Sequence, residues 1–210
     1  MKKVSIIIPY NKDRGFLREA IASAEAQTFG DKEIILQQGD FTLGKNLNDA
    51  LRKSTGEYIK VLAEDDMLYP TESIELLYNK IQEGYDWVVA GAENFGDLKD
   101  GWEYAQIWMP LQPTLKGMIK GNQIHGGTTI YKRSILFDTG GYDERLWTGE
   151  EYDLHLNLLA HGYKVGMLNK IVYRYRIHEH NKSMDMSPRA RELRRKYIEE
   201  KIKARYYGYI

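Results

Sequence analysis

The chain has 210 residues, enough for one domain with a substantial core, and its 30 basic and 30 acidic residues cancel. This balance gives no overall attraction to nucleic acid or to acidic membranes. Cysteine is absent, which excludes disulfides, a thiolate nucleophile and a cysteine-ligated zinc site, and suits a reducing compartment. The first nine residues hold an apolar run too short for a signal peptide or a membrane span.

The first 91 residues alternate between apolar runs typical of buried strands and segments with helical periodicity. This order predicts an α/β fold with a mostly parallel central sheet and helices on both faces. In such sheets ligands bind beyond the carboxyl ends of the strands. We expect strands at 4–8, 33–36, 58–63 and 86–91, and helices capped by Asn11 or Asp13, at 43–51 and at 74–81.

The second half of the chain is less regular, and no repeat or linker separates it from the first half. It predicts a smaller mixed sheet within the same single domain. Residues 184–210 are basic and helix-prone. We expect strands near 104–109, 128–131 and 164–175, and helical segments near 115–120, 134–138 and 150–161.

Three carboxylates, Glu64, Asp65 and Asp66, follow the apolar run at 58–63 without a spacer. Unpaired carboxylates at a strand end repel one another and are costly to desolvate. A hard divalent cation removes that cost, because Mg²⁺ and Mn²⁺ prefer oxygen ligands, and it can also bind a diphosphate. The alternative is a solvated acidic turn in which Asp66 caps the next helix.

Five segments in chain order resemble the family 2 glycosyltransferases of the GT-A fold; they are 4–11, 56–70, 140–143, 149–165 and 175–183. The resemblance implies an inverting enzyme that moves a hexosyl group from a nucleotide diphosphate sugar to an acceptor hydroxyl in glycan synthesis, with Mn²⁺ or Mg²⁺ as cofactor. The default donor is a UDP-sugar such as UDP-glucose. Residues 1–91 would then form the nucleotide-sugar half, and residues 92–183 the acceptor half.

The resemblance also implies a metal site in the acidic cluster. Ala63 replaces the first Asp of the family's Asp-x-Asp-Asp motif, so we expect Asp65 or Asp66 to bind the metal and the other to lie near the donor ribose. Glu64, in the variable position, is expected among the donor-binding residues.

The segment 175–183 resembles the family's Arg-x-His tail. His178 is expected as a metal ligand or a diphosphate contact. Arg176, Lys182 and Ser183 are expected to hold the diphosphate by charge-assisted hydrogen bonds. The alternative for this segment is a polar surface loop.

Gly149-Glu150-Glu151 resembles the start of the family's acceptor-site helix, whose second acid is the general base. This makes Glu151 the expected base and Glu150 the second candidate, because a sugar hydroxyl needs its proton removed as the new bond forms. The alternative is that both acids stabilise the helix through its dipole.

The nucleotide loops follow the first two strands. Tyr10 could stack on a base, Gln38 or Asp40 could contact a base edge, and Lys45 could face the diphosphate or be a solvated helix lysine. The segment 126–128 could let the backbone approach a sugar. The expected donor-binding residues of these loops are Pro9, Tyr10, Asn11, Gln38, Asp40 and Lys45, and the tryptophans considered for the acceptor side, or for core packing, are Trp102, Trp108 and Trp147.

The C-terminal stretch has a basic side and an apolar side. It could make peripheral contact with a membrane that carries a glycolipid acceptor, pack on the domain, or lead into a further domain of a longer protein. We expect a cytoplasmic protein, or one at the cytoplasmic face of a membrane.

Two rival functions remain open from the sequence. A sugar-phosphate nucleotidyltransferase would share the layout and the acidic site, but the first strand is followed by Pro9-Tyr10-Asn11 and not by a glycine-rich phosphate loop. A non-catalytic carbohydrate-binding domain would use the aromatic residues and would need neither nucleotide nor metal.

Overall fold

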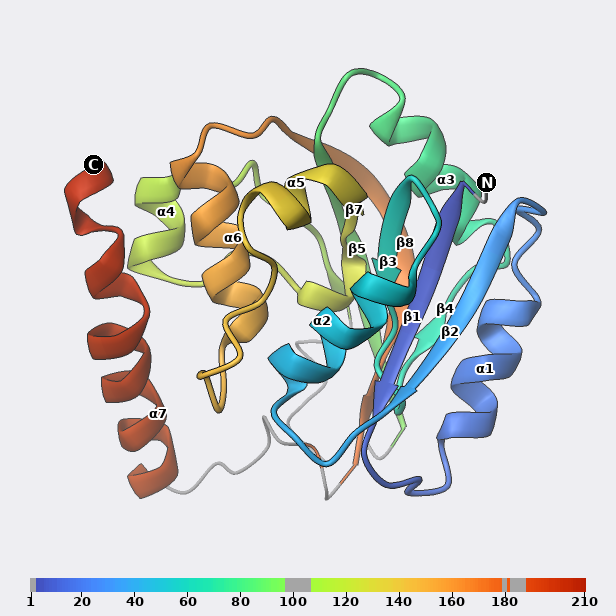
Figure 1. The fold of residues 1–210 in the computed structure, drawn as a ribbon, viewed down its shortest axis with the longest axis horizontal. Helices are drawn as coiled ribbons and strands as arrows, with labels where there is room; N and C mark the ends of the chain where they lie inside the picture. Colours follow the sequence, from blue (N-terminus) through green and yellow to red (C-terminus); the bar gives the residue numbers. More distant parts are fainter. Residues whose placement is uncertain (1–2, 97–106, 179–180, 182–187) are drawn as a thin grey trace.

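The computed structural model describes residues 3–96, 107–178, 181 and 188–210, and its strands form one mixed sheet (Figure 1). The strand order is β2-β1-β3-β7-β5-β8-β4, with β6 paired to β5. The strands are β1 Val4–Tyr10, β2 Lys32–Gln38, β3 Tyr58–Val61, β4 Met67–Leu68, β5 Trp87–Gly96, β6 Ile107–Trp108, β7 Ile130–Lys132 and β8 Val165–Ile177. The helices are α1 Leu17–Glu25, α2 Leu43–Lys53, α3 Ser73–Ile81, α4 Leu115–Lys120, α5 Arg133–Asp138, α6 Glu150–Ala160 and α7 Pro188–Lys201, with a 3₁₀ turn, η2, at Gly126–Thr128.

The first three strands pair as the alternating pattern predicts, with β1 parallel to both β2 and β3. The short strand β7 then lies between β3 and β5 and is antiparallel to both. Two reversals restore the direction, so β5 and its parallel partner β8 run the same way as β1. The carboxyl ends of β1, β2, β3, β5 and β8 therefore meet at one edge of the sheet.

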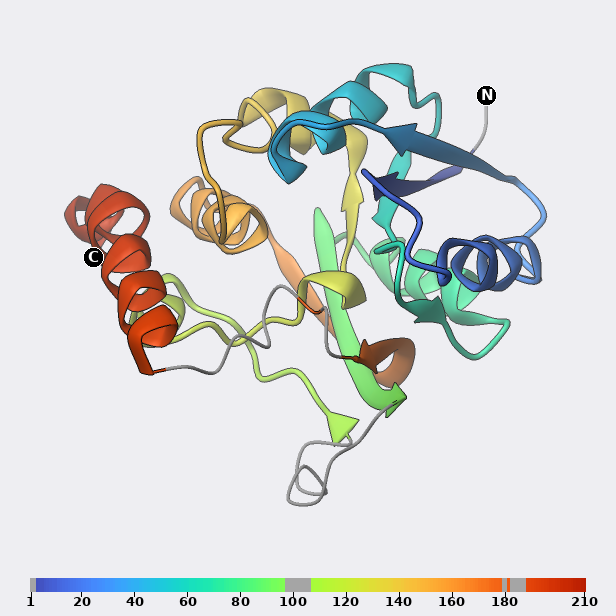
Figure 2. The same cartoon turned by 90° about the horizontal axis from the view of Figure 1, so that it is seen from below.

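Helices cover both faces of this sheet, and each face has its own core. One core contains Leu47 of α2, Leu136 of α5 and Leu154 of α6. The other contains Ala20 of α1 and Ile74 of α3. Figure 2 shows β1 between α2 on one side and α1 on the other, as expected for strands whose side chains alternate between two buried faces.

The structure corrects three expectations of local structure. Asn11 and Asp13 do not cap α1: Phe16 occupies the N-cap without a side-chain bond, and Asp13 accepts from Gly15 N at 2.7 Å within the preceding turn. The residues after the acidic cluster include strand β4, which pairs antiparallel with β8. The second-half strands join the main sheet and do not form a separate one, because β5 continues to pair with β8 across register shifts that bend the ladder.

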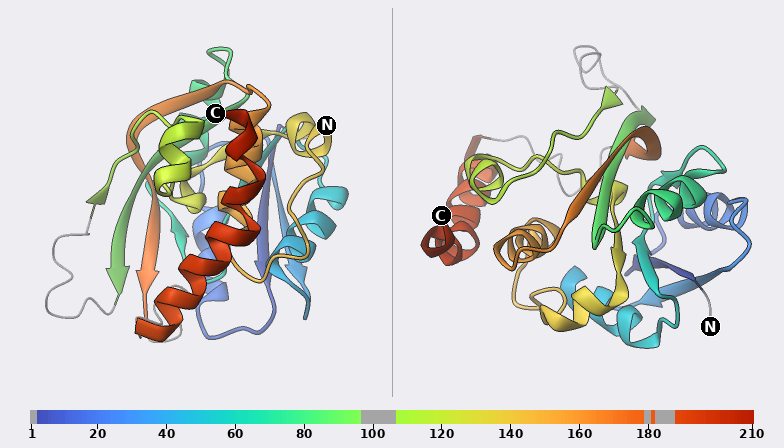
Figure 3. Two further views of the ribbon diagram at one scale, coloured as in Figure 1. Left: turned by 90° about the vertical axis from the view of Figure 1, so that its left-hand side faces the viewer. Right: turned by 90° about the horizontal axis from the view of Figure 1, so that it is seen from above.

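Helix α7 lies at the end of the molecule farthest from α1, on the side of α4 and α6 (Figure 3). Tyr197, Ile198, Ile202 and Tyr206 of this C-terminal region contribute to the core beneath α6. The apolar side of the C-terminal stretch thus faces the domain, one of the three expected arrangements. None of the helices in the described ranges combines the length and apolar composition needed to cross a membrane.

Candidate functional site

Asp66 ties the acidic turn after β3 to strand β8. Its carboxylate is 3% exposed and accepts from Tyr173 Oη at 2.7 Å and from Arg176 N at 2.8 Å. Burial, and next the charge of Asp65, raise the pKa of Asp66 well above its usual range. Each oxygen accepts one hydrogen bond from within the protein, and a metal or ribose role for Asp66 stays a prediction. Asp66 also does not cap α3, which begins at Ser73.

Asp65 and His178 form a carboxylate–imidazole pair beside this connection. His178 Nε2 lies 3.0 Å from Asp65 Oδ2, and the Asp65 side chain is 23% exposed. Asn181 fixes the histidine backbone, because its Oδ1 accepts from His178 N at 2.7 Å and its Nδ2 donates to Arg176 O at 3.0 Å. The ring of Phe16 packs 4.8 Å from the imidazole. The pair is therefore held in place from both sides.

Arg176 has structural partners in this arrangement. Its guanidinium lies between the rings of Phe16 and Phe95, donates to Asp65 O at 2.8 Å and pairs with Glu19 at 2.7 Å. These contacts brace the acidic turn, and a diphosphate role for Arg176 stays a prediction. The expected contacts Lys182 and Ser183 lie outside the described residues.

Glu64 contacts the loop after β1. It pairs with Arg14 at 2.8 Å, and burial raises its pKa. Its second oxygen, Oε2, is buried and has no hydrogen-bonding partner within the described part of the chain. Such an oxygen is costly unless a ligand hydroxyl or water donates to it, which suits the expected place of Glu64 near the donor.

Asp65 and His178 are predicted metal ligands that the structure brings together, and these two side chains could hold a divalent cation. Residues 3–96, 107–178, 181 and 188–210 contain no group of three or more metal-ligating side chains that could hold an ion. One carboxylate oxygen and one imidazole nitrogen suit Mn²⁺, and the remaining positions are of the kind that water and diphosphate oxygens fill. The two residues fit a cation that binds together with its nucleotide.

Glu150 and Glu151 open α6 after Gly149, whose φ of +80° marks the left-handed turn into the helix. Glu150 is 5% exposed, whereas Glu151 is partly buried with its carboxylate against Gly126 of η2. Burial, and next the charge of Glu150, raise the pKa of Glu151 to about 7, while Lys60 opposes the rise. A carboxylate with a pKa near neutrality is suited to general-base work.

Three residues that the sequence analysis missed connect the two acidic groups. Lys60 is fully buried, Tyr173 donates to Asp66, and the ring of His125 packs 5.5 Å from Tyr173. Burial lowers the pKa of His125 to about 4, so its ring is neutral at pH 7. The sequence does mark Lys60 as unusual, because it is a lysine inside an apolar strand. No sequence feature marks Tyr173 or His125 as functional.

The nucleotide loops lie at the carboxyl ends of β1 and β2, where Asn11, Gln38 and Asp40 are exposed. Gln38 Nε2 donates to Asn11 O at 3.4 Å, which joins the two loops. Pro9 is buried and pairs in register with Gln37, and Tyr10 is partly buried beside Gln38.

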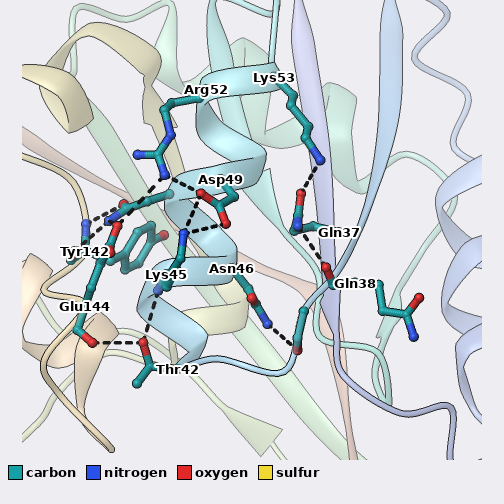
Figure 4. A network of polar contacts seen from close by, with 12 residues as sticks. Gln37, Gln38, Thr42, Lys45, Asn46, Asp49, Arg52, Lys53, Tyr142 and Glu144 are labelled. Atoms are coloured by element: carbon teal, nitrogen blue, oxygen red, sulfur yellow. Dashed lines mark hydrogen bonds and ion pairs between the residues drawn. The ribbon is translucent and has the colours of Figure 1, made fainter.

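Lys45 is held on the surface of α2 (Figure 4). Its Nζ lies 2.9 Å from Asp49 and 5.3 Å from the ring centroid of Phe41. Asn46 Nδ2 donates to Gly39 O at 2.9 Å and holds the loop after β2. Lys45 is thus near the nucleotide loop but already paired, and a diphosphate contact stays a prediction.

The tryptophans fall in different places. Trp108 is partly buried, and its ring lies 6.4 Å from that of His125, on the η2 side of the site. Trp147 is 48% exposed and packs on Tyr197 of α7. Trp102 lies outside the described residues. Of the two that the structure describes, Trp108 is the one close to the residues around Lys60.

A cavity of about 430 Å³ lies away from these groups, between α2, the 139–145 loop, α6 and the C-terminal segment. Its charged groups are paired with one another: Arg205 bonds to Asp143 at 2.9 Å and to Asp153 at 3.1 Å. None of the predicted site residues lines it.

Known proteins with similar sequences are glycosyltransferases. The family described as Glycosyl transferase family 2 matches residues 35–138. An uncharacterized glycosyltransferase of Rickettsia felis is 27% identical over 193 residues, which cover 74% of this chain and 31% of that protein. An uncharacterized glycosyltransferase of Rickettsia typhi is 28% identical over 211 residues, which cover 84% of this chain and 64% of that protein. The chain thus spans about a third of the length of the first relative.

Solved structures share the fold at low sequence identity. Staphylococcus aureus TarS in complex with UDP-GlcNAc matches with a TM-score of 0.67 and 17% identity, covering 84% of this chain and 59% of that one. The mannosyltransferase PcManGT of Pyrobaculum calidifontis, in complex with GDP-Man and Mn²⁺, matches with a TM-score of 0.62 and 13% identity, covering 85% and 58%. The chain thus matches the Glycosyl transferase family 2 model over residues 35–138, just under half of its length, and shares the GT-A fold of these transferases.

Proposed function

We propose that this protein is a metal-dependent, inverting glycosyltransferase that uses a nucleotide diphosphate sugar. One observation carries the proposal: an unbroken series of contacts joins the donor side to the base. Asp66 accepts from Tyr173, whose ring lies against Gly127, and the neighbouring Gly126 lies against the Glu151 carboxylate. This series of contacts supports placing the acidic turn and the candidate base in one site.

The donor diphosphate is proposed to bind beside Asp65 and His178. These two residues would hold the divalent cation, Mn²⁺ or Mg²⁺. Glu64 Oε2 would accept a hydrogen bond from a ribose hydroxyl. When bound, the cation supplies positive charge that offsets the charge of the departing nucleoside diphosphate. Asp66 and Arg176 keep the acidic turn in position.

Glu151 is proposed to take the proton of the acceptor hydroxyl as its oxygen attacks the anomeric carbon. A single displacement needs one carboxylate base and inverts the configuration at that carbon. Glu150 is more deeply buried and raises the pKa of its neighbour, which suits a supporting role.

The proposed donor is a UDP-sugar, with a hexosyl group transferred to a glycan or glycolipid acceptor. TarS, bound to UDP-GlcNAc, and PcManGT, bound to GDP-Man and Mn²⁺, support a nucleotide-sugar donor, although they carry different bases. The proposed setting is the cytoplasm or the cytoplasmic face of a membrane.

A thermal-shift panel tests the donor. UDP, GDP and their hexose derivatives are added with Mn²⁺, with Mg²⁺ or with EDTA, to wild type and to Asp65→Asn. Because a ligand of the native state raises its stability by mass action, we expect a base-selective rise that needs the cation and is lost in Asp65→Asn. Sugar binding without nucleotide would support a carbohydrate-binding domain, and nucleoside triphosphate binding a nucleotidyltransferase; either result would overturn the proposal.

A further inference from the structure

Lys60 is a buried lysine in the middle of β3. It is 0% exposed, and its Nζ donates to Val61 O at 2.8 Å and to Gly127 O. The ammonium also lies 5.0 Å from the ring centroid of Tyr173. No carboxylate of the described chain lies within ion-pairing distance of it. A charged group buried without an ion partner is costly, so a lysine here calls for a reason beyond stability.

The backbone group that Lys60 holds lies between the two halves of the site. Gly127 packs so closely on Tyr173 that a β-carbon there would overlap the ring, and a β-carbon at Gly126 would overlap the Glu151 carboxylate. Lys60 thus fixes the short turn η2, which forms the surface against which the Glu151 carboxylate rests. Tyr173 connects the same turn to Asp66.

The surroundings of Lys60 carry few other charges. Glu151 faces it from α6 and Asp66 from the acidic turn, and both oppose the fall in the pKa of Lys60 to about 7 that burial causes. His125, before η2, is neutral at pH 7, and burial raises the pKa of Tyr173 well above its usual range. Lys60 is therefore the positive charge that opposes protonation of Glu151.

We propose that Lys60 is a positioning residue for the base: it holds the Gly126–Gly127 turn beneath the Glu151 carboxylate and keeps a positive charge beside that carboxylate. The inference rests on the proposed role of Glu151. It deepens that role by explaining how the base stays ionised in a buried setting while the acidic turn adds negative charge nearby.

The test compares the pH dependence of kcat/KM in wild type and Lys60→Met, with the exposed Lys170→Met as the matched control. Met keeps most of the side-chain length and cannot carry a charge. Without the lysine, the acid limb is expected to move up by about one pH unit, so kcat/KM at pH 7 falls about fivefold. The defect disappears at alkaline pH, where Lys60 is itself neutral in the wild type.

A second measurement does not need activity. The pH dependence of the unfolding free energy is compared between Glu151 and Glu151→Gln proteins, in the wild-type and in the Lys60→Met background. The difference in unfolding free energy reports the pKa of Glu151 through proton linkage. We expect this pKa to be higher in the Lys60→Met background. Primary alkylamines, but not alkyl alcohols of equal length, should also partly restore Lys60→Ala.

The outcomes separate this inference from the proposed function. The role of Lys60 would be overturned if the acid limbs and the Glu151 pKa values were equal in the two backgrounds. It would also be overturned if Lys60→Met lowered kcat/KM equally at every pH. Either result would leave the proposed transferase activity standing. Full activity of Glu151→Gln would overturn the base assignment itself.

Discussion

Asp65 and His178 lie 113 positions apart in the chain, yet Asp65 Oδ2 and His178 Nε2 are 3.0 Å from each other. Strand pairing brings them together, because β4 and β8 join the acidic turn to the end of the sheet from which His178 follows. Asp66, next to this pair, connects through Tyr173 and η2 to Glu151, the predicted base.

The first prediction concerns the cation. Asp65→Asn removes the carboxylate charge while keeping the shape, so transfer should fall about a hundredfold or more, since metal-ion charge stabilisation is worth several kcal/mol. His178→Ala should weaken Mn²⁺ binding without unfolding the protein. Initial rates across a Mn²⁺ titration measure both effects, with the exposed Asp31→Asn as control. Unchanged rates in EDTA would rule out the metal role.

The second prediction distinguishes the two glutamates of α6. Glu151→Gln should bind the donor but lose about a hundredfold or more in kcat, the usual worth of a general base. Glu150→Gln should stay active, and because its charge raises the pKa of Glu151, the acid limb of its pH profile should move to lower pH. If Glu150→Gln abolished transfer and Glu151→Gln did not, the assignments would be reversed.

The third prediction concerns stability against pH. The folded-state pKa of Glu151 is about 7, above its value of about 4.3 in an unfolded chain. The folded protein then binds the extra proton between these values, so this group makes the protein less stable as pH rises from about 4.3 to about 7. Glu151→Gln should therefore gain about 3.5 kcal/mol at pH 8 and nothing at pH 4. Urea unfolding of wild type and Glu151→Gln at both pH values measures this gain. An equal stability difference between the two proteins at pH 4 and pH 8 would contradict the raised pKa.

The fourth prediction contrasts two neighbouring glycines. Gly127→Ala forces a methyl group against the fully buried Tyr173 ring and should cost about 1–3 kcal/mol of stability. The atoms nearest to a β-carbon at Gly126 are the carboxylate atoms of Glu151, which can rotate aside more easily than a buried ring, so Gly126→Ala should lower kcat with little change in Tm. Gly121→Ala, which meets nothing, is the control. Similar Tm losses for both variants would argue against this reading of η2.

The fifth prediction concerns the C-terminal segment that packs on α6. Ile202 is fully buried, and a β-carbon at Gly149 would lie 2.7 Å from its Cδ1; Tyr206 Oη donates to Asp153 Oδ1 at 2.8 Å. Ile202→Ala should cost about 2–5 kcal/mol by opening a cavity, and Tyr206→Phe about 1 kcal/mol by removing a buried hydrogen bond. Calorimetry measures both, with the exposed Tyr209→Phe as the reference. A stability unchanged by Ile202→Ala would mean that the tail does not brace α6.

Local chemistry was enough to predict most of the elements. The apolar run at 4–8 predicts β1, and the helical periodicity at 74–81 predicts α3. Both patterns depend only on residues close together in the sequence. The acidic cluster and the pair Glu150-Glu151 were also recognisable, since each is a short segment at an element boundary. The cap of α1 and strand β4 were missed because Phe16 and Met67–Leu68 take their conformation from partners elsewhere in the chain.

The division of labour within the acidic cluster depended on tertiary structure. Asp65 and Asp66 are chemically identical neighbours, and only the position of β8 gives Asp66 two buried donors and leaves Asp65 beside His178. The same holds for Lys60, an anomaly in an apolar strand until Gly127 and Tyr173 surround it. A side chain's identity sets which bonds it can make, but burial and long-range partners decide which of them it does make.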